Sequence, residues 1–350
     1  MELLNGLPGA NLRKKFGVAI FGVGRSGQIH LNNLSASHRA QVLYLVDRNT
    51  NLADDLVEQY NLEGDTTAIK DTDADEVFLD ERVQCVFVCT PTYTHYEIVQ
   101  KSLDHGKHVF CEKPISQNIE QTKQCYDDAE KAGKILFCSL NRRYDPSLQQ
   151  LFNKREEYGQ IFTVKSCSRD HPLPSLEYLK ISGGIFHDCA VHDIDFICWI
   201  LDSWPETVYV QGHTFSREIA ATNDLDTCFI IMKYPTNTSC VIELSRFASY
   251  GYHQTLEIFA ENGMFISENQ RPFEISVSNK QGMSYEPIKY SFPQRYKDSY
   301  EAALKNFFDV IQGKETLKIT KDSIVRVHKI IEACERGLST GQVVKIDYEH

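Results

Sequence analysis

Between residues 16 and 139, short apolar runs of strand length alternate with stretches of helical periodicity. Alternating strands and helices with short connections build a parallel sheet that carries helices on both faces. The pattern therefore predicts a doubly wound, Rossmann-type α/β domain at residues 16–140. The expected strands are 16–22, 41–46, 85–89, 107–111 and 134–139, and the helical patterns extend to 34, from 95 to 103 and from 119 to 131.

The apolar pattern changes after residue 140, where polar and apolar positions alternate with the period of half-buried strands. Consecutive strands with short turns, including a hairpin that turns at Glu261-Asn262-Gly263, favour antiparallel pairing. We expect residues 141–350 to form a second α/β domain, with an open, mostly antiparallel sheet packed on a buried helix at 185–201. Strands are expected at 161–166, 207–213, 227–233, 240–244, 256–266 and 343–348, and further helices at 146–157, 296–311 and 322–338.

The segment from 185 to 201 is apolar almost all round, which is the composition of a buried helix. It nevertheless carries Asp188, His192 and Asp195, spaced four and three apart, so all three are expected on one face. Burying two carboxylates and an imidazole costs desolvation energy unless polar groups lie opposite them. A cleft that holds a polar ligand would explain this stripe, and so would a structural hydrogen-bond cluster.

The composition is that of a globular protein, with 42% hydrophobic and 24% charged residues among 350, enough for two domains. The net charge of -11 argues against nucleic acid or an anionic membrane as a partner, and no apolar run could span a bilayer. Residues 1–15 lack the pattern of a secretory signal and are expected to form a short, partly disordered extension. The eleven cysteines include no Cys-x-x-Cys pair, which favours reduced thiols in the cytoplasm and no metal site.

A Gly-x-Gly-x-x-Gly sequence, Gly22 to Gly27, follows the first strand and opens the first helix. In the dinucleotide fingerprint, the first glycine permits the tight turn and the second lets the backbone approach the pyrophosphate. The third glycine, Gly27, lets helix and strand pack closely. Asp47 ends the second strand, where it can accept hydrogen bonds from both adenosine ribose hydroxyls. Asp47 therefore favours NAD over NADP, whereas the neighbouring Arg48 could pair with a 2′-phosphate.

A second motif, Cys111-Glu112-Lys113-Pro114, stands at the carboxyl end of the strand at 107–111. Ligands of open parallel sheets bind outside the carboxyl ends of the strands, so Lys113 is expected to point toward the nicotinamide end of the cofactor crevice. The proline fixes the turn and keeps the next helix from starting early. An exposed, solvated lysine is the alternative interpretation.

In combination, three motifs resemble the Gfo/Idh/MocA oxidoreductase family: the glycine loop with His30, Glu112-Lys113-Pro114, and Gly183-Gly184 followed by Asp188, His192 and Asp195. The segments 141–146, 168–170 and 295–296 are similar to the inositol 2-dehydrogenase branch, from which the chain departs at His171 and near Cys189. The resemblance covers nearly the whole chain from residue 16. It implies a Rossmann domain and a substrate-binding α/β domain whose open sheet forms homodimers or homotetramers, with catalysis at Lys113, Asp188 and His192.

Oxidation of an alcohol needs a base for the hydroxyl proton and an acceptor for the hydride. His192 can take the proton near neutral pH, Asp188 can orient its ring, and Lys113 can supply positive charge where oxygen charge develops. Expected contacts to a hydroxyl-rich substrate are Arg142, Arg143, Asp170, His171, Asp195 and Tyr296. Expected cofactor contacts are Gly22, Gly24, Arg25, Ser26, Gly27, Gln28, Ile29, Asp47, Arg48, Thr90, Pro91, Thr92, His95, Glu112 and Lys113.

The sequence thus predicts an NAD-dependent dehydrogenase that oxidises a secondary hydroxyl of a cyclic polyol, myo-inositol or scyllo-inositol, to the inosose. Two alternatives stay open, an NADP-linked sugar or trans-dihydrodiol dehydrogenase and a non-catalytic dinucleotide-binding regulator. A regulator has no need of a base, so the complete set of Lys113, Asp188 and His192 favours an enzyme.

Overall fold

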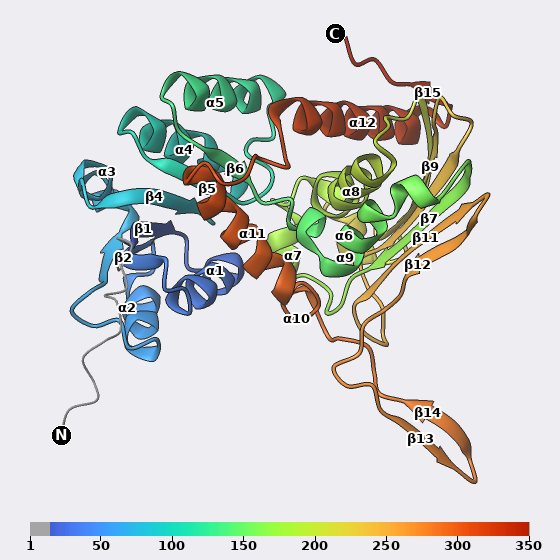
Figure 1. Ribbon diagram of the computed structural model, residues 1–350, viewed down its shortest axis with the longest axis horizontal. Coiled ribbons are helices and arrows are strands. Elements are labelled where there is room, and N and C mark those ends of the chain that lie inside the picture. Colours follow the sequence, from blue (N-terminus) through green and yellow to red (C-terminus); the bar gives the residue numbers. More distant parts are fainter. Residues whose placement is uncertain (1–14, 350) are drawn as a thin grey trace, which may run out of the picture.

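The first sheet has six parallel strands in the order β3-β2-β1-β4-β5-β6, with helices on both faces (Figure 1). The structure, a computed structural model, describes residues 15–349. The predicted doubly wound parallel sheet is confirmed. Its strands are β1 (Phe16–Phe21), β2 (Ala40–Asp47), β3 (Thr67–Lys70), β4 (Val83–Val88), β5 (His108–Cys111) and β6 (Leu136–Cys138). Its helices are α1 (Arg25–Ser35), α2 (Thr50–Gln59), α3 (Asp75–Leu79), α4 (His95–Asp104) and α5 (Ile119–Lys131).

The strand order places β1 at the centre of this sheet, between β2 and β4. Its residues Val18, Ala19 and Ile20 are fully buried, as expected for a parallel strand with helices on both sides. The chain runs outward through β2 and β3, then returns to β4 on the other side of β1. The loop after β1 therefore lies at the topological switch point, where open α/β sheets bind their ligands.

A helix from the second half of the chain completes the core of the first domain. The Phe307 side chain of α11 (Lys297–Ile311) meets the rings of three neighbouring strands edge-on, at centroid distances of 5.5–5.8 Å: Phe87, Phe110 and Phe137. Buried residues of both halves accordingly belong to one continuous hydrophobic cluster. The two domains are therefore held together by core packing.

The second sheet has seven strands in the order β12-β11-β7-β10-β9-β8-β15. Within the described residues, only the pair of β7 and β10 is parallel, so the expected open, mostly antiparallel sheet is confirmed. Its strands are β7 (Ile161–Arg169), β8 (Thr207–His213), β9 (Thr227–Lys233), β10 (Ser239–Ser245), β11 (His253–Ala260), β12 (Gly263–Ser267) and β15 (Val344–Lys345). Its helices are α6 (Pro146–Asn153), α7 (Leu176–Leu179), α8 (Val191–Leu201), α9 (Arg217–Ala220), α10 (Phe292–Arg295) and α12 (Lys321–Thr340).

The two faces of the second sheet differ in their surroundings. The helices α6, α8 and α12 cover one face (Figure 1). The other face is exposed although it carries large apolar side chains, each 43–57% exposed: Phe229, Ile231, Phe259, Met264 and Ile266. Contiguous exposed apolar side chains of this kind mark interaction surfaces in soluble proteins.

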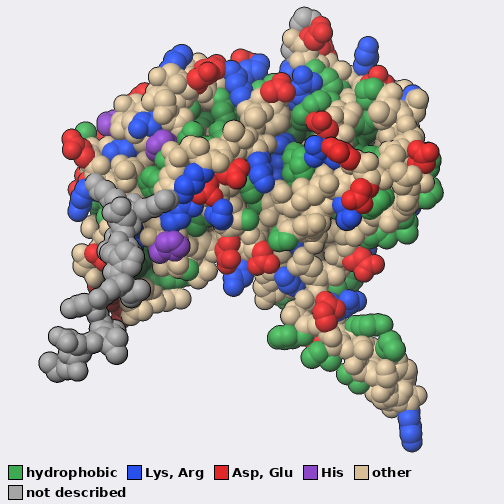
Figure 2. Space-filling view, in the orientation of Figure 1, with side chains coloured by type: hydrophobic (Ala, Val, Ile, Leu, Met, Phe, Trp, Pro, Cys, Tyr) green, Lys and Arg blue, Asp and Glu red, His purple; other side chains and the backbone are tan. Residues whose placement is uncertain are grey.

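A two-stranded arm, β13 (Ser276–Asn279) and β14 (Gly282–Tyr285), extends from the body of the molecule (Figure 2). Every residue of both strands is exposed, and the sequence pattern did not predict them. Within the described part of the chain, no helix is both long and apolar enough to cross a membrane. The expected disorder of the N-terminal extension falls on residues 1–14, which lie outside that part.

Candidate active site

The glycine-rich loop between β1 and α1 has the shape that a dinucleotide fingerprint requires. Gly22 has a φ of +86°, in the left-handed region that favours glycine. A Cβ on Gly27 would lie 2.0 Å from the carbonyl oxygen of Gly22, so the close approach of helix and strand requires glycine. A Cβ on Gly24 would meet no atom within 4 Å, so the backbone there faces open space.

The first turn of α1 presents backbone amides to this open space. No side chain caps the helix at Gly24, so the first N–H groups stay available to a ligand. These amides and the positive end of the helix dipole favour phosphate groups. Arg25 lies exposed beside them, with its guanidinium 4.7 Å from the ring centre of Phe292. The loop therefore fits the pyrophosphate of a dinucleotide.

Asp47, the last residue of β2, is fixed next to the glycine loop. Its Oδ2 accepts a hydrogen bond from Val23 N at 2.8 Å, and its Oδ1 accepts one from Asn49 N at 2.9 Å. Arg48 is engaged elsewhere, because its Nε lies 3.0 Å from Oδ2 of Asp71. Arg48 is thus already paired with Asp71 rather than free to bind a 2′-phosphate. This favours the interpretation that Asp47 accepts hydrogen bonds from the ribose hydroxyls.

Two buried side chains tie together the loops after β4 and β5. The ring nitrogens of His95 lie 2.8 Å from the carbonyl oxygens of Thr90 and Pro114. Glu112 Oε1 lies 2.7 Å from His30 Nε2, which helps to lower the pKa of Glu112 although burial alone would raise it. Both ring nitrogens of His95 are thus engaged by the loops, and its contact with the cofactor stays a prediction. Both residues support the turn that presents Lys113.

The remaining predicted cofactor residues surround the same loops. Gln28 Nε2 donates to Val23 O at 3.0 Å, and Ile29 packs against a cluster of three tyrosines from the second domain. Ser26 lies in the first turn of α1. The turn after β4 consists of residues that are half-buried or exposed: Thr90, Pro91 and Thr92.

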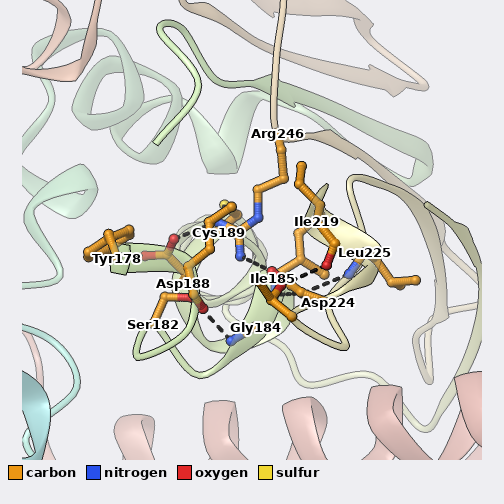
Figure 3. A network of polar contacts seen from close by, with 12 residues as sticks. Tyr178, Ser182, Gly184, Ile185, Asp188, Cys189, Ile219, Asp224, Leu225 and Arg246 are labelled. Carbon is orange, nitrogen blue, oxygen red and sulfur yellow. Dashed lines mark hydrogen bonds and ion pairs between the residues drawn. The ribbon is translucent and has the colours of Figure 1, made fainter. Parts of the chain in front are cut away.

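Lys113 reaches from the carboxyl end of β5 into the second domain and contacts Asp188 directly. Its Nζ donates to the carbonyl oxygen of Asp188 at 2.9 Å and to Oδ1 at 3.0 Å. The Tyr178 hydroxyl donates to the same Oδ1 at 2.6 Å, while Nη1 of Arg246 donates to Oδ2 at 2.6 Å (Figure 3). The side chains of Lys113 and Asp188 are 15% and 10% exposed, so the pair is largely shielded but keeps some access to solvent.

A π-helical turn, η5 (Phe186–Ala190), carries Asp188 and continues directly into α8. The sequence predicted a regular helix here, whereas the structure has a wider π-helical turn at Asp188, followed by a regular helix that carries His192 and Asp195. Gly184, with a φ of +84°, lets the chain enter the turn. Isolated π-turns inside helices occur frequently at functional sites.

His192, in the first turn of α8, is half-buried, and its Nδ1 has no hydrogen-bond partner among the described residues. Burial lowers the pKa of His192 well below the usual histidine value, and the charges of Arg142 and Lys113 lower it further. The imidazole is therefore neutral and able to accept a proton. The expected orienting hydrogen bond from Asp188 is not formed, because its oxygens bind other partners. Asp188 acts on His192 through its charge, which raises the histidine pKa.

Asp170, at the end of β7, lies close to this cluster. Burial and the charge of Asp188 raise the pKa of Asp170 to about 6. Its Oδ2 accepts a weak hydrogen bond from Cys189 Sγ at 3.4 Å. The next residue, His171, packs edge-on against Tyr290 at 4.6 Å, where the chain returns from the arm. Asp170 and His171 remain predicted substrate contacts.

Arg142 and Tyr296 are buried next to each other, and the charge of Arg142 acts on His192. Nη1 of Arg142 donates to Asp193 Oδ2 at 2.9 Å, and its guanidinium lies 5.2 Å from the ring centre of Tyr296. The Tyr296 hydroxyl donates to Oε1 of Gln254 at 3.2 Å. Arg142 and Tyr296 are each 4% exposed, and their contact with substrate remains a prediction.

The structure corrects the expectation that Arg143 and Asp195 bind substrate. Nε and Nη2 of Arg143 hold the two Asp195 oxygens at 2.8 and 2.5 Å, and Nη1 donates to Lys318 O at 2.7 Å. Both side chains are buried, so their hydrogen-bonding groups are used inside the protein. The pair joins the domain boundary to α8, which is a structural role.

Three residues of the cluster were not predicted from the sequence: Tyr178, Asp224 and Arg246. Arg246 is 58 positions from Asp188 and 22 from Asp224, so no local spacing connects them. The available signals were an acidic pair at 224 and 226 before β9 and an arginine directly after β10. The sequence alone does not show which residues these side chains contact.

Comparisons with known proteins agree with this architecture. Residues 16–140 match the family GFO_IDH_MocA, described as an oxidoreductase family with an NAD-binding Rossmann fold, and residues 151–266 match its C-terminal domain. The chain is 31% identical to a myo-inositol 2-dehydrogenase of Thermotoga maritima, over 94% of this chain and 98% of that protein. It is 25% identical to an NAD(+)-dependent scyllo-inositol 2-dehydrogenase of Bacillus subtilis, over 94% and 96%. A solved myo-inositol dehydrogenase of Corynebacterium glutamicum superposes with a TM-score of 0.87, at 28% identity and 95% and 99% coverage.

Proposed function

Because the chain belongs to the Gfo/Idh/MocA oxidoreductase family, whose Rossmann domain binds NAD, we propose that it oxidises a secondary hydroxyl of a cyclic polyol to a ketone. The proposed substrate is myo-inositol or scyllo-inositol, and the product is the inosose. The relatives named above support this substrate class. The observation that carries the proposal is the contact of Lys113 with Asp188 beside His192, at the carboxyl end of β5.

In the proposed reaction, the ring nitrogen Nε2 of His192 takes the hydroxyl proton. The lowered pKa keeps His192 unprotonated at neutral pH, so that the ring can accept a proton, and it also makes the imidazole a weaker base than a solvent-exposed histidine. The Lys113 ammonium, held by Asp188, stabilises the negative charge that develops on the substrate oxygen. When bound, NAD accepts the hydride from the same carbon. The C–H electron pair thus leaves toward NAD, the proton goes to His192, and a carbonyl remains.

Substrate recognition is assigned to polar groups on the wall of the cleft. Asp170, with its pKa of about 6, accepts hydrogen bonds from ring hydroxyls when it is ionised. Arg142 keeps its guanidinium in place through Asp193 and contributes positive charge beside the substrate. His171 and Tyr296 complete the proposed set of contacts. Paired donors and acceptors of this kind are needed for a molecule rich in hydroxyls.

A substrate panel tests the proposal directly. The purified protein is incubated with inositol isomers, aldoses and a trans-dihydrodiol, with NAD or NADP, and reduced nicotinamide is followed by absorbance. Oxidation of an inositol with NAD supports the proposal. Preference for an aldose or a dihydrodiol with NADP would favour the alternative dehydrogenase. Tight NAD binding without turnover of any of these substrates would favour a regulator.

We also propose that the exposed face of the second sheet joins copies of this chain into a homodimer or homotetramer. The apolar side chains on that face, among them Ile231 and Phe259, support this assignment. We expect Ile231→Lys to reduce the mass measured by size-exclusion chromatography with light scattering. Phe215→Lys, an exposed apolar position in the loop after β8, is the matched control and should leave the mass unchanged. A monomeric wild type would refute this assembly.

The proposed location of the protein is the cytoplasm. All eleven cysteines are free, and nine of them are buried in the structure. Unpaired thiols in this number are typical of a reducing compartment.

A further inference from the structure

We infer that Arg246, together with Asp224, is a positioning residue that holds Asp188 in the orientation in which it binds Lys113. This inference rests on the proposed dehydrogenase function and adds a residue to its machinery. Arg246 follows β10 directly and is fully buried, with 0% of its surface exposed. An arginine is rarely buried to this extent unless its charge is paired. The partners of Arg246 therefore indicate its purpose.

A single guanidinium connects the two carboxylates. Nη1 of Arg246 lies 2.6 Å from Asp188 Oδ2, and Nη2 lies 2.6 Å from Asp224 Oδ2 (Figure 3). Because the guanidinium is planar and rigid, it fixes the separation and the orientation of the carboxylates that it binds. Lysine could supply the charge at this position but could not hold two carboxylates in a fixed plane.

Asp224 connects this pair to the helix that carries Asp188. Its Oδ1 accepts hydrogen bonds from the backbone N–H groups of Ile185 and Leu225, both at 2.8 Å. Ile185 directly precedes the π-helical turn η5. Arg246 is thus anchored to the start of the turn through Asp224 and to its middle through Asp188. The two contacts fix the π-turn as well as the carboxylate.

Arg246 determines which oxygen of Asp188 is available to Lys113. With Arg246 on Oδ2, Oδ1 is left to Lys113 and Tyr178. Buried ion pairs rarely add net stability, so positioning explains this cluster better than stabilisation does. The titratable groups that face Asp188 from the surrounding elements are Lys113, Arg246, Tyr178, Asp170, Cys189 and His192.

The test compares Arg246→Gln and Arg246→Lys with a matched buried carboxylate, Asp226→Asn. Asp226 is fully buried, and its carboxylate accepts hydrogen bonds from the backbone N–H groups of Phe215 and Ser216. Its contact with Arg246 joins the two backbones, Arg246 N to Asp226 O at 2.7 Å, so Asp226→Asn does not remove it. For Arg246→Gln we expect kcat to fall about 10- to 100-fold, the effect of a small misplacement of a catalytic group. The affinity for NAD should not change, because the Arg246 side chain contacts Asp188, Cys189 and Asp224 in the second domain and lies apart from the glycine loop. Asp226→Asn should lower the melting temperature without this loss of turnover per folded molecule.

The pH profile separates positioning from general stability. Burial raises the pKa of Asp188, and the charges of Lys113 and Arg246 lower it by more, so the folded-state pKa lies below its usual value. In the wild type, the acid limb of kcat/KM reports His192. Removing the positive charge in Arg246→Gln should raise the pKa of Asp188, so that protonation of this carboxylate joins the limb and moves it to higher pH. Arg246→Lys should keep the limb near its wild-type position while kcat still falls. An unmoved limb in Arg246→Gln, with activity that follows the folded fraction, would overturn the inference.

A second measurement does not depend on activity. Because the pKa of Asp188 is depressed in the folded state, its contribution to stability is present above the unfolded value of about 3.9 and is lost as pH falls below it. The melting temperature of Arg246→Gln should therefore fall less steeply than that of the wild type below that pH. Equal slopes would contradict the inference. A wild type that oxidises no polyol would instead refute the proposed function and leave this comparison intact.

Discussion

Replacing Lys113 by alanine should lower kcat more than it lowers the free energy of unfolding. The contacts of Lys113 explain this difference. Its Nζ makes two hydrogen bonds to Asp188, and Asp188 would keep Arg246 and Tyr178, each at 2.6 Å. Breaking a buried ion pair costs about 3–5 kcal/mol when it leaves a charge alone. Because Asp188 stays paired, we expect a loss of about 1–3 kcal/mol in the free energy of unfolding.

The rate should respond more strongly. Removing one preorganised group that stabilises developing oxygen charge lowers kcat by about 10²–10³, which corresponds to about 2.7–4 kcal/mol. The affinity for NADH, measured by fluorescence titration, should change little. The reason is that the Lys113 ammonium points to Asp188 in the second domain, whereas the glycine loop lies at the end of β1.

Lys107→Ala is a matched control for this experiment. Lys107 directly precedes β5, is 6% exposed, and donates from its Nζ to Asp80 O at 2.8 Å. This variant also loses a buried lysine, so its melting temperature should fall while turnover per folded molecule stays normal. Near-normal turnover in folded Lys113→Ala, or an equal loss of turnover in Lys107→Ala, would refute the electrostatic role.

The remaining predictions concern the base and the cofactor loop. His192→Ala should lower kcat by about two to four orders of magnitude with little change in melting temperature. In the wild type, the acid limb of kcat/KM should lie below the usual histidine pKa of about 6.5, because burial, Arg142 and Lys113 lower the pKa of His192. Asp47→Ser should raise the NADP-to-NAD ratio of kcat/KM, and equal use of both cofactors by the wild type would contradict the assigned role of Asp47. Gly24→Ala should weaken NAD binding without destabilising the fold, whereas Gly27→Ala should lower stability by about 1–3 kcal/mol, because its Cβ would lie 2.0 Å from the Gly22 oxygen.

The fold could be predicted where the local pattern of residues along the chain determines the secondary structure. The apolar run of β1, the glycines at 22, 24 and 27, and the aspartate that ends β2 are local signals, and each is placed as expected. The missed elements have weak signals. Strand β3 has four residues with a single buried side chain, and both strands of the arm are fully exposed. Hydrophobic periodicity cannot detect a strand that buries almost nothing.

The candidate site was predictable only in part, because it is built by contacts between distant segments. Lys113 and Asp188 were both predicted, but their direct contact joins residues 75 positions apart. The π-turn also escaped prediction, since an extra residue in one turn leaves no mark in composition. The role expected of Asp188 changed because its carboxylate oxygens bind residues from distant segments. Its carboxylate faces Lys113 and Arg246, and it acts on His192 through charge.

The errors at Arg143 and Asp195 follow from chemistry that sequence cannot resolve. The adjacent arginines 142 and 143 bind Asp193 and Asp195, the residues directly before and after Ile194 in α8. These two buried pairs attach α8 to the domain boundary and thereby set the position of His192 between the pairs and the Lys113–Asp188 contact. Arginine and aspartate serve equally well as substrate ligands or as partners in a buried structural ion pair. The difference lies in whether their hydrogen-bonding groups are already used. Only the folded structure shows that each guanidinium nitrogen of Arg143 donates to Asp195 or to the Lys318 carbonyl oxygen.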